Sequence, residues 1–264
     1  MEFRQSFLAK FAGLHEGEEQ LRARSLSLLE ADEAMRAHAA TIELGQDVLN
    51  ILIHDDAHRD DDDLTIRLLG IRLFNACAAS MNLLLGGYYQ NATFQLRDIL
   101  ETAFLLDFLR SDVGLVAEWR TSDKKARKKK FSPIAIRSAL DDRDGFTERK
   151  REEAYSLLCE LASHPTIMGF QMLRPDGQNA VLGPFLEEKA LKAIFSELAR
   201  LQIQSVGNFM IFFDWTSGAV AEAKVEFMAT QDAWFTRFYE RPPQSAMTAQ
   251  LRHDLAQMRL AKGW

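Results

Sequence analysis

The sequence lacks the short motifs by which many enzymes are recognised. It contains no His-Glu-x-x-His zinc motif, no Glu-x-x-His pair of the di-iron bundle kind, no P-loop, no Gly-x-Gly-x-x-Gly after a strand and no Gly-x-Ser-x-Gly. These absences count against the common hydrolase, nucleotide-binding and di-metal classes. We therefore expect no cofactor and no bound metal.

Cysteine is scarce. Cys77 and Cys159 are the only two, and both lie within apolar helical patterns without the spacing of metal ligands. Such usage is typical of a reducing compartment and predicts two buried, inert thiols.

Long apolar runs are also missing. The longest, residues 73–87, is interrupted by Asn75 and Asn82 and is too short to cross a bilayer, and residues 1–19 carry charges where an export signal would be apolar. We expect a cytoplasmic protein with no membrane contact.

What is present is an ordinary globular composition, with 47% hydrophobic and 27% charged residues. The net charge of −6 is uneven, because residues 1–63 hold 6 Lys and Arg against 15 Asp and Glu. An acidic N-terminal part and a mildly basic remainder can attract each other, which bears on partners and not on fold.

Apolar residues recur with helical spacing almost everywhere, so we predict an all-α multi-helix bundle. A sevenfold column of Leu and similar residues runs from Leu14 to Leu49, beside a column of small and polar residues, a combination that suits close packing of long antiparallel helices. This predicts a long helical arm over 14–53, broken near 30–33, which packs on the body or on a second subunit. We divide the chain into an arm (1–62) and a helical body (63–264), and expect a homodimer.

Residues typical of helix ends and turns predict the boundaries of the other elements. Acids at 60–63 start a helix, Gly86-Gly87 bends the chain, and further helices are expected over the ranges 88–110, 148–163, 185–214, 218–239 and 244–262. The turn sequence Pro175-Asp176-Gly177 between two short extended runs predicts a small β-hairpin over 169–184.

The helix over 88–110 carries the first candidate site. On a helical wheel, Arg97 and Glu101 share the side of Phe94, Phe104 and Phe108, and their i, i+4 spacing allows them to pair. The solvated side of the same wheel holds Asn91, Gln95, Asp98 and Thr102. Two interpretations stay open: an internal ion pair that fixes the helix register, or a pocket in which Arg97 holds an anionic group. Tyr88 and Tyr89 begin the same helix, and their hydroxyls can extend either network.

Three other clusters bear on function. His164, at the end of its helix with Glu160 one turn earlier, is either a capping residue or a general acid or base. His54 and His58 have metal-ligand spacing but lie in a segment expected to be a solvated acidic loop. The third is a run that can contact nucleic acid or simply be solvated: Lys124, Lys125, Arg127, Lys128, Lys129 and Lys130.

One combination of residues carries a family resemblance: Gly87-Tyr88-Tyr89, Leu96-Arg97, Glu101, Trp119, Ile136-Arg137, Tyr155 and Ser163-His164-Pro165. Over residues 65–200 the chain resembles a family of uncharacterised bacterial helical proteins. More distantly it resembles the HEPN superfamily of helical bundles, many of which are RNases. The Arg followed four to six residues later by His that those nucleases carry is missing here, so the resemblance implies a binding or dimerising role.

We expect, first, a non-catalytic helical protein that binds a partner or ligand and self-associates. The alternative is a metal-independent RNase or nucleic-acid-acting defence protein in which Arg97, Glu101 and His164 form the catalytic site. A third possibility is a small-molecule pocket lined by aromatic residues, which at such density are ordinarily core: Phe94, Phe104, Phe108, Phe209, Phe212, Phe213 and Trp215.

Overall fold

A computed structural model describes residues 2–55, 59–177 and 179–262. The helices follow one another as α1 (Glu2–Ala31), α2 (Glu33–His54), α3 (Asp61–Leu85), α4 (Tyr89–Leu109), α5 (Leu115–Thr121), α6 (Lys124–Lys130), α7 (Pro133–Asp144), α8 (Lys150–Leu158), α9 (Ile167–Gln171), α10 (Glu188–Phe209), α11 (Gly218–Tyr239) and α12 (Ser245–Lys262). The prediction of an all-α bundle is confirmed.

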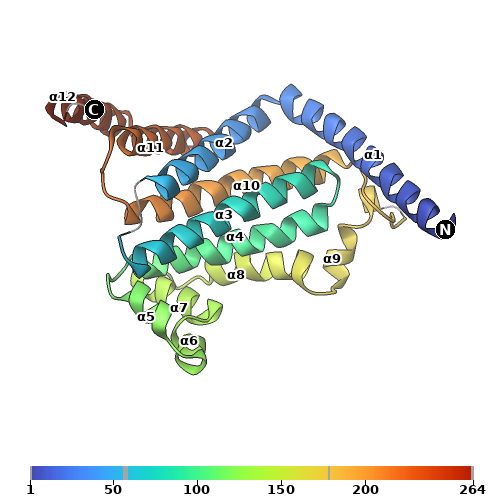
Figure 1. Cartoon of the computed structure of the whole chain (residues 1–264), viewed down its shortest axis with the longest axis horizontal. Helices are drawn as coiled ribbons and strands as arrows, with labels where there is room; N and C mark the ends of the chain where they lie inside the picture. Colours follow the sequence, from blue (N-terminus) through green and yellow to red (C-terminus); the bar gives the residue numbers. More distant parts are fainter. Residues whose placement is uncertain (1, 56–58, 178, 263–264) are drawn as a thin grey trace.

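Helices α2, α10, α3 and α4 run lengthwise beside one another and form the body of the bundle (Figure 1). Helix α8 continues this layer, α5, α6 and α7 cluster at one end, and α11 covers α2. One large apolar core joins residues of all four central helices, among them Leu49, Leu84, Leu100 and Phe195. The cluster of α5 to α7 is therefore held by the ends of α3 and α4.

Asp32 divides the predicted arm into two helices. Its carboxylate accepts hydrogen bonds from the backbone N–H groups of Ala34 and Met35, so it caps α2 and ends α1. Helix α2 is buried against α10, and a Cβ at Gly45 would lie 2.7 Å from Gln202 Cγ. The expected break and the close packing at a small residue are both confirmed, while the division at residue 62 stays a prediction.

The Gly86-Gly87 bend is confirmed between α3 and α4. Gly87 has a φ of 86°, and an added Cβ would lie 2.5 Å from the carbonyl oxygen of Phe185. Only glycine fits this left-handed conformation beside another backbone.

The β-hairpin predicted over 169–184 is wrong. Thr166 caps a short helix, α9, where the first strand was expected, and a 3₁₀ turn over Pro175–Gly177 replaces the β-turn. One backbone bond, from Val181 N–H to Leu173 O, closes the segment, and no strand occurs among the described residues. Two short strands without a third strand or a buried face are marginal in water, so local helix capping prevails.

By length and composition, α3 is the one helix in the described ranges that is apolar enough to cross a membrane. This is weak evidence, because α3 packs against both α4 and α10 and a core helix has the same composition. Of the two thiols, Cys77 is buried and burial raises its pKa to about 12, whereas Cys159 is half-buried.

A buried histidine joins α2 to α11 and should make stability depend on pH. His38 Nδ1 accepts a hydrogen bond of 2.9 Å from Trp234 Nε1, and its ring stacks on Phe238. Burial lowers the pKa of His38, and the nearby charge of Arg237 acts in the same direction. The unfolded chain therefore binds this proton more tightly than the folded chain.

We predict that the contribution of neutral His38 to the free energy of unfolding is fully present above the ordinary histidine pKa of about 6.5. This contribution is lost as the pH falls from there through the lowered pKa of His38 in the folded protein. The measurement is the thermal midpoint between pH 7.5 and 5. A His38→Gln variant, whose amide oxygen can still accept from Trp234, should show a shallower decline. Equal slopes would exclude His38 as the titrating group.

Candidate functional site

The predicted ion pair between Arg97 and Glu101 forms, and a third residue completes it. Arg97 Nη2 donates to Glu101 Oε1 at 2.8 Å and to the Tyr155 hydroxyl at 2.7 Å. The Tyr155 hydroxyl in turn donates to Glu101 Oε1 at 2.9 Å. Both charged side chains are about three-quarters buried, with 24% and 25% exposure. Arg97 and Glu101 therefore neutralise each other inside a network that Tyr155 closes.

Tyr155 comes from α8, which packs along α4. Burial raises the pKa of Tyr155, and although Arg97 opposes this effect, Glu101 reinforces it. The hydroxyl consequently keeps its proton at neutral pH and can donate to the carboxylate. Helix α8 ends three residues later in a π-helical turn, Cys159–Ser163, which often marks a functional or strained segment.

The wheel used for the prediction is only partly correct. Phe94 is 43% exposed although it was assigned to the inner side, and Thr102 is buried although it was assigned to the wet side. Thr102 lines a hollow together with residues of α3, α5 and α7, neighbours that a single-helix wheel cannot anticipate.

His164 is not part of this network. Gln90 Nε2 donates to the carbonyl oxygens of Leu161 and Gly169, which fixes the His164 loop at the first turn of α4. Gln90 precedes Arg97 by seven residues, or roughly 10 Å along a helix. His164 is exposed, and among the described residues no hydrogen bond or ion pair joins its side chain to Arg97, Glu101 or Glu160.

The two tyrosines at the start of α4 serve the fold. Tyr88 donates to Glu18 Oε1 at 2.6 Å and so ties α1 to α4. Tyr89 is 1% exposed, and its hydroxyl accepts from the backbone N–H of Glu187 at the start of α10. Both hydroxyls predicted as binding groups thus have partners within the chain.

The basic run forms a short helix, α6. Asp123 caps α6, and no α6 residue is buried. Lys130 pairs with Glu118, and Arg127 donates to the carbonyl oxygen of Ser122. The remaining positive side chains form an exposed patch, which we call the α6 patch: Lys124, Lys125, Lys128 and Lys129.

Of the predicted histidine pair, His54 lies within the described residues and His58 does not. His54 Nδ1 hydrogen-bonds the carbonyl oxygen of Asn50 at 2.9 Å, whereas His58 and Asp56 lie outside the described residues. Within the described ranges, no group of three or more His, Cys, Asp or Glu side chains could hold a metal ion.

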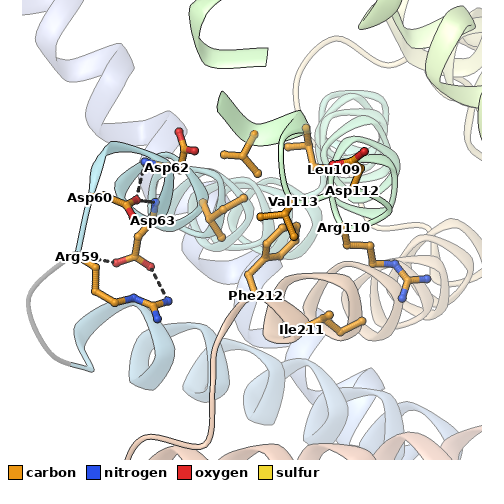
Figure 2. Close-up of a pocket in the computed structure, with 12 residues that line it drawn as sticks. Arg59, Asp60, Asp62, Asp63, Leu109, Arg110, Asp112, Val113, Ile211 and Phe212 are labelled. Carbon is orange, nitrogen blue, oxygen red and sulfur yellow. Dashed lines mark hydrogen bonds and ion pairs between the residues drawn. The ribbon is translucent and has the colours of Figure 1, made fainter. Parts of the chain in front are cut away.

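Two hollows lie at the end of the bundle near α5. The first, of about 370 Å³, is the aspartate-rimmed pocket shown in Figure 2. Asp60 caps the start of α3, Asp63 pairs with Arg67, and Asp62 pairs with Arg120. Asp112, at the opposite wall, accepts a hydrogen bond from the backbone N–H of Gly114. The acidic side chains of this pocket therefore already have partners that hold α3 and the loop before α5.

The second hollow, of about 270 Å³, is the Arg137 pocket. It lies between α3, α4, α5 and α7, with this lining: Leu69, Arg72, Glu101, Thr102, Phe104, Leu105, Trp119, Phe131, Pro133, Ile136 and Arg137. It shares Glu101 with the Arg97 network, and its walls are mainly aromatic and aliphatic. An apolar hollow with a few convergent polar groups is the usual form of a ligand site.

Arg137 belongs to the sequence pattern that carries the family resemblance, but it was not predicted as a site residue. Its side chain is 7% exposed, and its guanidinium carbon lies 4.1 Å from the centre of the Tyr155 ring. Nε and Nη1 are buried without a hydrogen-bond partner. The available signal was its spacing within α7, four residues after Pro133 and three before the buried Leu140, which puts it on the inner face of the helix.

The geometry thus brings together Arg97, Glu101, Tyr155 and Arg137 from three helices. It leaves His164 at the other end of α4. No protein-family model, curated protein or solved structure matches the chain. The resemblance to HEPN proteins stays a prediction, and we infer the function from the geometry of the site.

We predict that Tyr155→Phe destabilises the protein by about 1–3 kcal/mol, because two hydrogen bonds to charged groups are lost while the ring under Arg137 remains. Urea unfolding measures this change. Tyr155→Leu also removes the ring contact with both guanidinium groups, so it should lower the free energy of unfolding further than Tyr155→Phe does. If Tyr155→Phe matched the wild type, the hydroxyl would not hold the network together.

Proposed function

We propose that the chain is a non-catalytic helical binding protein whose ligand occupies the Arg137 pocket. One observation carries this proposal: an aromatic hollow of about 270 Å³ has a wall that contains a buried guanidinium with unpartnered donors. Buried polar groups in folded proteins nearly always have partners, and here the unpartnered donors lie beside a hollow from which a ligand could reach the guanidinium.

The alternative of a metal-independent RNase has less support. General acid–base chemistry needs the acid and base within hydrogen-bond reach of one reacting group. Arg97 and Glu101 bind each other and Tyr155. His164 is exposed in a loop that lies beside the first turn of α4. The α6 patch favours contact with a polyanion, but α6 contains no histidine or carboxylate that could act as a general acid or base.

Self-association belongs to the same proposal. Helix α1 extends away from the bundle (Figure 1), and Leu14 and Leu26 on it are 39% and 40% exposed. Its second half is fixed, because Ser25 donates to the carbonyl oxygen of Leu85 and Leu29 is buried. A second copy would cover the apolar side chains that α1 leaves exposed.

We predict that Leu105→Phe, which fills the Arg137 pocket from α4, removes ligand binding. A fragment library, observed by saturation-transfer NMR, should give signals that the wild type shows and this variant loses. Val113→Phe is the matched control, because Val113 lines the aspartate-rimmed pocket and is 96% exposed.

Two results would contradict the proposal. One is a library in which no fragment distinguishes the two variants. The other is cleavage of single-stranded RNA by the purified chain that Arg97→Ala with His164→Ala abolishes, which would favour the RNase alternative.

We predict further that Leu14→Lys with Leu26→Lys lowers the molar mass measured by light scattering from that of a dimer to that of a monomer. The fold should persist, because neither side chain is in the core. Arg22→Ala, a change on the same helix that leaves the apolar residues in place, should keep the wild-type mass. A monomeric wild type would remove the self-association claim.

A further inference from the structure

The charges around the Arg137 pocket do not balance. Arg72 pairs with Asp98, and Arg97 pairs with Glu101. Among the described residues no ion pair involves Arg137, although it lines the same hollow and is 93% buried. An arginine keeps its proton at any physiological pH, so the cluster carries one uncompensated positive charge.

Stacking on Tyr155 offsets only part of the free-energy cost of burying this charge. The guanidinium lies 4.1 Å from the ring centre, and such contacts stabilise weakly compared with the desolvation of a charge. Tyr155 also faces Arg97, whose guanidinium carbon is 5.1 Å from the same ring centre. Two cations therefore face one aromatic ring, while the carboxylate of Glu101 pairs only with Arg97.

Helix α7 adds to the positive potential. Pro133, Ile136 and Arg137, from its first two turns, all line the pocket. The N-terminal end of a twelve-residue helix favours a negative charge. The α6 patch precedes α7 directly along the chain, and exposed cations at this position raise the local concentration of anions.

The apolar walls of the pocket determine the size and the aromatic character of the ligand. Trp119, Phe131 and Phe104 give flat apolar surfaces, and Leu69, Leu105 and Ile136 fill the space between them. The volume is slightly below the range of about 300–1,000 Å³ typical of drug-sized ligands, so the ligand is small. Glu101, whose carboxylate is on the same wall, repels a second negative charge.

From this geometry we infer that the Arg137 pocket binds small aromatic monoanions, with a carboxylate or a similar singly charged group on Arg137 and the ring against Trp119 and Phe131. The inference rests on the proposed function and names its ligand class. Arg137 is a ligand-binding residue in this account, and Tyr155 positions it.

The test compares 1-naphthoate with 1-naphthamide, which has the same ring system without the charge, by isothermal titration calorimetry. The wild type should bind naphthoate about tenfold or more tightly, the discrimination typical of a charge-assisted hydrogen bond. Arg137→Met should abolish that preference, and Arg137→Lys should keep part of it. Lys129→Met, which removes an exposed cation of the α6 patch, should leave it unchanged.

A second measurement separates binding from folding. If Arg137 served only the fold, Arg137→Met would lower the thermal midpoint of the unliganded protein. We expect an equal or higher midpoint, because a buried unpaired charge is replaced by an apolar side chain of similar length. A lower midpoint would overturn the assignment, as would equal affinity for naphthoate and naphthamide.

The two proposals fail in different ways. If no fragment distinguishes Leu105→Phe from Val113→Phe, the pocket does not bind ligands and the proposed function fails. If fragments do enter the pocket but neutral ones bind as well as anionic ones, the pocket is a binding site and only the ligand class is wrong.

Discussion

The arrangement at the end of the bundle depends on Tyr155, whose ring faces two guanidinium groups while its hydroxyl joins one of them to a carboxylate. Arg97 and Glu101 are on α4, Arg137 is on α7, and Tyr155 is on α8. A single tyrosine thus couples three helices through polar contacts in a place where apolar packing would leave their relative rotation less defined. Buried polar networks fix geometry in this way when their members find partners.

Arg137 differs from the other buried cations because it has no anionic or carbonyl partner in the part of the chain that the structure describes. Arg67 is also buried, yet it donates to Asp63 and to the carbonyl oxygens of Ile53 and Asp55, where it compensates the end of α2. Lys224 donates to the carbonyl oxygen of Phe213. These two charges stabilise the fold by binding groups of the same chain. The contrast makes Arg137 a candidate for binding a group from outside.

Much of the fold follows from local sequence signals. Asp32, Asp60, Ser132 and the Gly86-Gly87 pair each mark a helix boundary, because capping and left-handed backbone are chemical demands of a few residues. The hairpin failed for the opposite reason. A β-ladder needs a partner surface that the local sequence cannot specify, and the segment around Thr166 had a helix cap instead.

The site was only half predictable, and the reason is geometric. The Arg97–Glu101 pair depends on spacing within one helix, which a sequence displays directly. Tyr155 and Arg137 reach that pair from 54 and 36 residues away from Glu101, through the packing of α8 and α7 on α4. A wheel of α4 also placed Thr102 in solvent, because it contained no information about the neighbouring residues of α3, α5 and α7. Helix contacts between distant segments decide which charges face one another, and this decides whether a charge is left without a partner. The unpaired guanidinium is therefore a property of the assembled bundle, and it is the observation on which the proposed preference for anions rests.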